Sequence, residues 1–169
     1  MRLSRMPVLG LGLGVAIVTL ALDQASKMFI LNWSQSWDHP VYTVTPFLDW
    51  VAIWNIGISY GLFPQGEAGR WVLVAINVVA ALIFSVWLAR TGRKLEGLAL
   101  GLLIGGAIGN AVDRMVYGAV FDFISFHAFD RRWYVFNIAD VAVVVGVGLL
   151  LYDTLILRAS KSPPSGVKS

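Results

Sequence analysis

The sequence has no cysteine, only two histidines and few charged residues, and each shortage removes a class of function. Without cysteine the chain cannot form disulfides, thiolate nucleophiles or thiolate metal sites. His39 and His127 lack the His-Glu-x-x-His spacing of zinc peptidases, so no metal site is predicted. With 14% charged residues, 57% hydrophobic residues and a mean hydropathy of +0.72, the 169-residue chain is too apolar for a soluble domain of its size. The composition indicates a membrane protein.

Apolar runs of the length that crosses a bilayer, about 20 residues, occur four times in the chain. They predict a mainly α-helical membrane protein in which residues 1–158 form a single domain. The tail at 159–169 is rich in Ser, Pro and Lys and is predicted to be disordered. A cleaved signal peptide is not favoured, because the first apolar run continues past Lys27 and no small-x-small cleavage site follows it. The predicted spans are residues 7–29, 71–89, 97–114 and 136–157.

The basic residues are divided unevenly among the segments that connect these spans. Eight of the 13 lie at the N-terminus, in the loop after the second span and in the tail, which four spans place on one side. Positively charged loops stay cytoplasmic, so both termini are predicted to face the cytoplasm and residues 30–70 and 114–135 to face outward. This distribution accounts for the net charge of +3 without nucleic acid as a partner. The eight residues are Arg2, Arg5, Arg90, Arg93, Lys94, Arg158, Lys161 and Lys168.

The first outward segment, residues 32–69, has the pattern of a small β-sheet. Val41 to Thr45 alternates in the manner of a strand, and Phe47 to Trp54 forms a second β-like run. We expect a small extracytoplasmic sheet, or cradle, between the first two spans.

The third predicted span carries glycines four residues apart. This spacing places small residues on one helical face and allows a neighbouring helix to approach closely. We therefore interpret Gly101, Gly105, Gly106 and Gly109 as packing positions.

Two aspartates, Asp122 and Asp140, are the strongest candidates for chemistry. Asp122 lies in Phe121-Asp-Phe-Ile124 and Asp140 ends Phe136-Asn-Ile-Ala-Asp140, both at the outer edge of the membrane region. A carboxylate at membrane depth costs roughly 3 kcal/mol on insertion scales, so two of them indicate chemistry or transport. Neither has a basic residue within four positions, and we interpret them as a catalytic couple.

Two other aspartates at the same predicted depth have basic neighbours. Asp23 and Lys27 are four residues apart on the first span, in the favourable order for a helical ion pair. Asp113 is followed directly by Arg114. An intramembrane charge usually needs a partner, so Asp23 and Asp113 are interpreted as ion-paired scaffolding.

Two asparagines complete the polar set. Asn110 shares a helical face with Asp113 and Arg114 on the third span. Asn137 precedes Asp140 by three residues, where its amide could orient the carboxylate or bind a substrate backbone. Polar clusters from three spans and two outward segments at one depth predict a functional site.

Two carboxyl groups that approach closely in a low-dielectric pocket cannot both ionise and share one proton. The ionised partner can then take a proton from a water molecule while the protonated partner donates to a scissile carbonyl oxygen. A Ser26–Lys27 dyad is disfavoured, because adjacent helical residues point about 100° apart. The residues therefore favour an aspartic peptidase.

Other functions remain open from the residues alone. In a proton-coupled transporter or small channel, intramembrane aspartates would relay protons, but here the carboxylates crowd one interface instead of stepping across the bilayer. In a purely structural subunit, the polar clusters would be needlessly costly. A presenilin-like protease is disfavoured because no Gly-x-Gly-Asp block occurs.

Five blocks of the sequence occur in a specific order and spacing. They are Asp23-Gln-Ala-Ser-Lys27, Asn55-Ile-Gly57 with Gly61, Gly105-Gly-Ala-Ile-Gly-Asn-Ala-Val-Asp-Arg114, Asp122-Phe-Ile124 and Phe136-Asn-Ile-Ala-Asp140. In these blocks the chain resembles the bacterial lipoprotein signal peptidases, or signal peptidase II. The four spans and the chain length also fit, so the resemblance covers nearly the whole chain.

By this resemblance, Asp122 and Asp140 would form the catalytic dyad. The family removes the signal peptide from diacylglyceryl-modified prolipoproteins in the bacterial inner membrane, cutting just before the lipidated cysteine. It needs no metal or cofactor and is blocked by globomycin-type peptides, and we expect a monomer surrounded by membrane phospholipid. The residues that would support the site or contact the substrate are Asp23, Lys27, Asn55, Gly57, Asn110, Asp113, Arg114 and Asn137.

The chain departs from the family pattern at a few positions. Ile58, Ser59 and Tyr60 follow Gly57 where the family usually has small residues and then Phe, and Phe121 stands where an aliphatic residue is common. These departures concern the shape of the substrate groove and leave the predicted chemistry unchanged.

Overall fold

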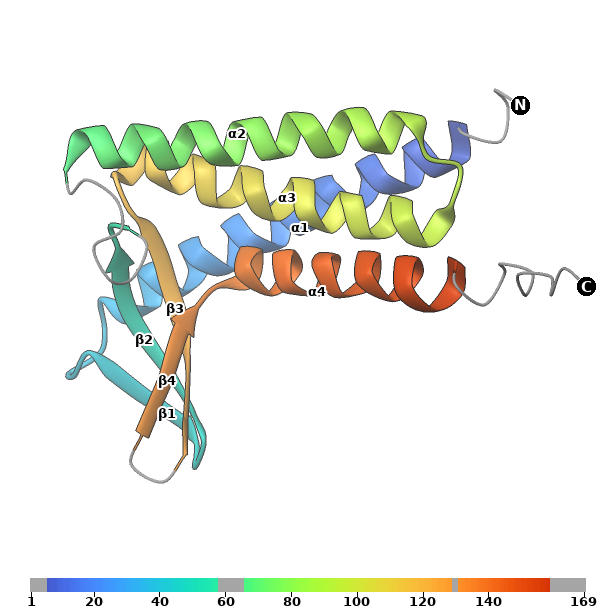
Figure 1. Ribbon diagram of the computed structural model, residues 1–169. Coiled ribbons are helices and arrows are strands. Elements are labelled where there is room, and N and C mark those ends of the chain that lie inside the picture. The colour runs from blue at the N-terminus through green and yellow to red at the C-terminus, as the bar shows by residue number, and fades with distance from the viewer. Residues whose placement is uncertain (1–5, 58–65, 129–130, 159–169) are drawn as a thin grey trace, which may run out of the picture.

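The computed structural model describes residues 6–57, 66–128 and 131–158, and within them four long helices form a bundle (Figure 1). Each is long and apolar enough to cross a membrane, which confirms the predicted fold class. The predicted tail at 159–169 lies outside the described residues. The helices are α1 (Met6–Ser34), α2 (Glu67–Arg90), α3 (Lys94–Tyr117) and α4 (Ile138–Tyr152), and α4 continues into a π-helical turn, η1 (Asp153–Arg158).

Helix α3 lies at the centre of the bundle, and its glycines set how close its neighbours approach. It packs against α1, α2 and α4. A Cβ added at Gly105 would lie 2.7 Å from the backbone oxygen of Ala16 on α1. One added at Gly106 would lie 2.6 Å from the backbone oxygen of Ala139 on α4. Both distances are too short for real Cβ atoms, so the packing interpretation of these two glycines is confirmed.

Replacing Gly105 by alanine is expected to destabilise the protein, because the added methyl group would overlap the backbone of α1. Overpacking of this kind costs about 1–3 kcal/mol. Gly14→Ala on α1 is the matched control, since nothing lies within 4 Å of a Cβ added there. Thermal unfolding of both variants in one detergent measures the difference. Equal stability of the two variants would contradict the close approach of α1 and α3.

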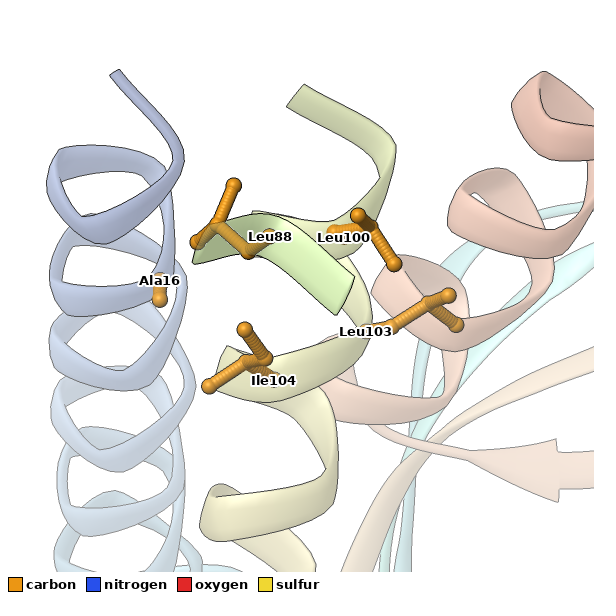
Figure 2. Packing of buried hydrophobic residues seen from close by; sticks show 5 residues of the cluster. All are labelled: Ala16, Leu88, Leu100, Leu103 and Ile104. Carbon is orange, nitrogen blue, oxygen red and sulfur yellow. The ribbon is translucent and has the colours of Figure 1, made fainter. Parts of the chain in front are cut away.

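Aliphatic side chains fill the bundle in the half away from the sheet. Ala16 of α1 lies opposite Leu88 of α2 and Ile104 of α3, with Leu100 and Leu103 on the same stretch of α3 (Figure 2). All five residues are buried. Because lipid tails are as apolar as these side chains, close packing holds the helices together here. A separate group of buried polar residues, which includes Asp23, Lys27, Asn110 and Asp113, lies at the end of the bundle that carries the sheet.

A four-stranded antiparallel sheet projects from one end of the bundle (Figure 1). One pair of its strands lies between α1 and α2, as predicted, and a second pair lies between α3 and α4. The second pair was not predicted, because residues 120–125 are mostly buried on both faces and lack a polar and apolar alternation. The strands, in spatial order, are β1 (Val41–Thr45), β2 (Leu48–Asn55), β3 (Val120–Ala128) and β4 (Arg131–Phe136).

An apolar cluster joins the sheet to the bundle. Buried Ile30 of α1 packs with Phe121 and Phe123 of β3. Trp54 of β2 adds a ring contact to Phe121, with centroids 5.1 Å apart. This cluster fixes the start of β3, which carries Asp122, against the end of α1.

Candidate active site

The structure places Asp122 and Asp140 at the end of the bundle that carries the sheet. Asp122 is in the first half of β3, directly after α3, and Asp140 is in the first turn of α4. The Asp122 residue is 2% exposed, whereas Asp140 lines an open cleft. These two residues are called the aspartate pair below.

Asn137 binds both members of the aspartate pair. Its side-chain Nδ2 donates to Asp122 Oδ1 at 2.7 Å, and its backbone N–H donates to Asp140 Oδ2 at 3.3 Å. Its Oδ1 in turn accepts the Asp140 backbone N–H at 3.0 Å. The last two bonds form a capping box at the start of α4, where the helix dipole favours a carboxylate. One fully buried residue therefore holds the two carboxyl groups close together.

Asn110 of α3 connects the aspartate pair to the interior of the bundle. Its Nδ2 donates to Asp140 Oδ1 at 2.9 Å. Its Oδ1 accepts from Asn137 Nδ2 at 3.3 Å and from Lys27 Nζ at 3.4 Å. Its amide orientation is thus fixed, with the acceptor toward the lysine and the donor toward the carboxylate.

A β-bulge in β2 places Asn55 beside Asp122. Asp49 pairs with Ser125, but Asn55 pairs with Val120, so β2 contains one extra residue between these two pairs. Side chains alternate between the faces of a strand, and the extra residue moves Asn55 to the face that carries Asp122. Asn55 Nδ2 donates to Asp122 Oδ2 at 3.0 Å, and the Gly57 N–H holds Asn55 Oδ1 at 3.2 Å.

The environment of Asp122 opposes its ionisation. Burial and, to a smaller degree, the nearby charge of Asp140 raise the pKa of its carboxyl group to about 6, against the lowering effect of the Asn55 and Asn137 hydrogen bonds. Both oxygens accept hydrogen bonds, which fix the group in position but do not outweigh the effects that raise its pKa. Asp122 can therefore hold and release a proton near neutral pH.

A buried ion triad lies beneath the aspartate pair. Lys27 Nζ is 2.8 Å from Asp23 Oδ2 and 2.8 Å from Asp113 Oδ2, and all three side chains are at most 5% exposed. The Asp23–Lys27 pair is confirmed. Asp113, however, pairs with Lys27 from α1 and not with its sequence neighbour Arg114, because adjacent residues on a helix point in different directions.

The two carboxylates of this triad bind the backbone next to the aspartate pair. Asp23 Oδ1 accepts the N–H of Ala139, the residue before Asp140, at 2.9 Å. Asp113 Oδ2 accepts the N–H of Phe121, the residue before the other member of the pair, at 3.1 Å. The triad thus anchors the start of α4 and the start of β3 to the same lysine.

Comparison with known proteins identifies the family of the chain. The family model described as Signal peptidase (SPase) II matches residues 15–156. The chain belongs to the signal peptidase II family. Among its relatives, the lipoprotein signal peptidase of Methylorubrum extorquens (strain PA1) is 51% identical over 160 residues, which cover 91% of this chain and 90% of that protein. The lipoprotein signal peptidase of Rhodopseudomonas palustris (strain TIE-1) is 50% identical over 159 residues, which cover 90% of this chain and 97% of that protein.

Solved structures with the same architecture are also membrane proteins. A bacterial membrane enzyme solved at 2.3 Å resolution has a TM-score of 0.77 and 26% identity, covering 94% of this chain and 95% of that one. A second bacterial membrane enzyme, solved at 1.9 Å resolution, has a TM-score of 0.73 and 25% identity, and the match covers 91% of this chain and 95% of that one. This member of the signal peptidase II family is therefore a multi-pass membrane protein with a shared fold.

The remaining predicted residue, Arg114, lies at the edge of the site. Its Nη1 donates to the backbone oxygen of Asn110 at 3.2 Å, and its guanidinium is close enough to interact with the charges of Asp122 and Asp140. Its buried Nε has no hydrogen-bond partner among the described residues. The guanidinium therefore retains donor capacity beside the aspartate pair.

Sequence reasoning missed Gln24, which belongs to the ion triad's surroundings. Its Nε2 donates to Asp113 Oδ1 at 2.9 Å and to Asp23 Oδ2 at 3.1 Å. Gln24 is uncharged, so it does not stand out in the sequence as a possible ion-pair partner. It is also adjacent to Asp23, whereas helical side-chain pairs are expected three or four residues apart.

The groove positions Ile58, Ser59 and Tyr60 lie outside the part of the chain that the structure describes.

Proposed function

We propose that this chain is an aspartic endopeptidase that removes the signal peptide from diacylglyceryl-modified prolipoproteins, cutting on the N-terminal side of the lipidated cysteine. The observation that carries the proposal is the double attachment of Asn137 to Asp122 and Asp140. It brings together two carboxyl groups, one of which has a pKa near 6. Family membership supports the substrate class, since the relatives are named lipoprotein signal peptidases.

In the proposed reaction, the aspartate pair holds one proton and a water molecule. The ionised carboxylate takes a proton from the water, whose oxygen attacks the scissile carbonyl carbon, while the protonated carboxyl group donates to the carbonyl oxygen. The tetrahedral intermediate collapses as its C–N bond breaks, and the leaving amine takes the proton that the first carboxyl group had received from water. The other carboxylate takes back a proton from a hydroxyl of the intermediate, so the pair again holds one proton. The shared proton belongs to the pair, so neither residue is assigned as the permanent acid.

The other polar residues have positioning or substrate roles in this proposal. Asn55, Asn110 and Asn137 fix the carboxylate oxygens through the hydrogen bonds described above. The Nε of Arg114 has no hydrogen-bond partner among the described residues, and the guanidinium is proposed to bind a carbonyl of the substrate backbone. Gly57, held by Asn55, leaves its side of the site free of a side chain.

The proposed location follows from the charge distribution and from the depth of the site. The protein would cross the bacterial inner membrane four times with both termini in the cytoplasm, as the basic residues indicate. The sheet and the aspartate pair would then lie at the periplasmic face, where lipidation holds a precursor in the outer leaflet. We expect the protein to act as a monomer among phospholipids and to be blocked by globomycin-type peptides.

The test of this function uses two precursor peptides of identical sequence, one with a diacylglyceryl group on its cysteine and one without. The purified protein in lipid nanodiscs is expected to cleave the lipidated peptide and to leave its twin nearly intact. Mass spectrometry of the products locates the cut. Ion flux in proteoliposomes that depends on Asp122, without cleavage of either peptide, would favour a transporter instead.

Cleavage is expected to decrease as the pH rises through about 6, the pKa to which burial and the charge of Asp140 raise Asp122. Above this pH Asp122 is ionised and the proton for the carbonyl oxygen is lost. The dependence of kcat/KM on pH, measured from about pH 4 to about pH 8, reports the ionisation of the free enzyme. Activity that increases steadily across this range would exclude Asp122 as part of the proton-sharing pair.

A further inference from the structure

A cleft of about 480 Å³ opens beside Asp140, where β4 meets α4. In Figure 1, β4 leads directly into α4, so the cleft lies at the junction of the sheet and the bundle. It begins at one member of the aspartate pair and follows the first turns of α4 along the bundle. The residues that line it are Tyr134, Phe136, Asp140, Val141, Val143, Val144 and Val145.

The lining suits a hydrocarbon chain better than an extended peptide. Apart from the carboxyl group of Asp140 and the hydroxyl group of Tyr134, its side chains are hydrocarbon. Every residue of an extended peptide brings an N–H and a C=O group that are not paired within the peptide, and burying these without partners in an apolar setting costs free energy. An acyl chain brings no polar group and gains from leaving water or from close packing.

The cleft also opens toward the surrounding lipid. Val144 is 70% exposed and Val145 is 45% exposed on a helix of membrane-spanning length. At a rise of about 1.5 Å per residue, Asp140 and Val145 are separated by about 7.5 Å along the helix axis. A chain that is already in the bilayer can therefore enter from the side without crossing a polar layer.

We propose that this cleft is the subsite for an acyl chain of the lipidated substrate. The inference rests on the proposed function and adds to it the place where the lipid is bound. Binding there would hold the modified cysteine next to Asp140, and so place the bond before it at the aspartate pair. The cleft would thus determine the preference for lipidated precursors.

The test compares two lipidated peptides that differ only in their glyceryl esters, one with palmitoyl chains and one with acetyl groups. Wild-type protein is expected to have a lower KM for the palmitoyl peptide. Val144→Trp fills the cleft from its lipid-facing side and is expected to raise that KM by about 10-fold or more, the effect of altering a hydrophobic pocket. The KM for the acetyl peptide and both kcat values are expected to change little.

Val79→Trp is the matched control, because Val79 is a 52% exposed valine on α2 that does not line the cleft. It is expected to leave both KM values as in wild type. A photoreactive palmitoyl chain on the peptide, bound to the Asp122→Asn variant, is expected to label α4 between Val141 and Val145. This binding measurement does not depend on cleavage.

Three results would overturn the inference. Val144→Trp could impair the acetyl peptide as much as the palmitoyl peptide, which would assign the cleft to the peptide itself. Labelling confined to other helices would exclude the acyl chain from the cleft. Either of these two results would leave the proposed peptidase function intact. The third result, failure of the wild-type protein to cleave either peptide, would overturn the proposed function together with the subsite.

Discussion

Replacing Asp122 or Asp140 by asparagine is expected to lower kcat for a lipidated precursor by about 10⁴-fold, the upper end of the range for general acid–base catalysis. An amide can neither take a proton from water nor donate one to the carbonyl oxygen at neutral pH. Each variant removes one half of the proton-sharing pair, so the double variant is expected to be no worse than either single one. Cleavage is measured with the lipidated peptide at saturating concentration.

The fold is expected to survive these changes. In Asp122→Asn, the loss of a buried carboxylate with a raised pKa stabilises the protein at neutral pH. The new amide also loses one acceptor for the hydrogen bonds from Asn55 and Asn137, and this opposes the gain. The two effects act in opposite directions, and the unfolding temperature should remain close to that of wild type.

Asp49→Asn is the matched control for the aspartate pair. Asp49 is another buried carboxylate of the sheet, 3.3 Å from His127, and it lies outside the candidate site. Its variant is expected to retain normal cleavage. If Asp122→Asn or Asp140→Asn also cleaves at a near-normal rate, that residue does not belong to the catalytic pair.

Replacing Lys27 by methionine is expected to cause the largest loss of stability. The change leaves Asp23 and Asp113 as buried carboxylates without their common cation. Removing one partner of a buried ion pair costs about 3–5 kcal/mol. Activity measured at temperatures where the variant is still folded should also be lower than in wild type, because the two backbone anchors of the aspartate pair depend on this triad. Lys94→Met, at an exposed lysine, is the control for loss of one positive charge.

A variant in which all three residues of the triad are neutral distinguishes the effect of the buried charges from the effect of the backbone hydrogen bonds. In the triple variant Asp23→Asn, Lys27→Met, Asp113→Asn, each new asparagine keeps a carbonyl oxygen that can accept the backbone N–H of Ala139 or Phe121. The buried charges are gone, so much of the lost stability and part of the activity should return. Unfolding in detergent and kcat at low temperature are the two measurements. A triple variant less stable than Lys27→Met would contradict the role given to the triad.

The four spans could be predicted from the sequence because bilayer thickness fixes their length and hydropathy marks them. Strands β1 and β2 were also predictable, since Val41 to Thr45 alternates in the usual way. Strands β3 and β4 were not, because residues around Phe121 and Phe123 are buried against Ile30 of α1 and the alternation is lost. The formation of β3 and β4 depends on burial against other elements, and a local sequence pattern contains no information about that burial.

The candidate site was predictable as a set of residues but not as a network. Helical spacing correctly paired Asp23 with Lys27, because that contact is local. The partner of Asp113 lies on a different helix, and the sequence neighbour Arg114 was the wrong choice. The bulge that turns Asn55 toward the site depends on the register of two strands far apart in the chain.

The most direct test of the central claim is the ionisation of Asp122 itself. The chemical shift of its carboxyl carbon can be followed against pH by NMR and assigned by its absence in Asp122→Asn. The account predicts a midpoint at about 6 in the wild-type protein and a lower midpoint in Asp140→Asn, where the repelling charge is removed. A wild-type midpoint at the ordinary aspartate value of about 3.9, or one that Asp140→Asn leaves unchanged, would contradict a proton-sharing pair.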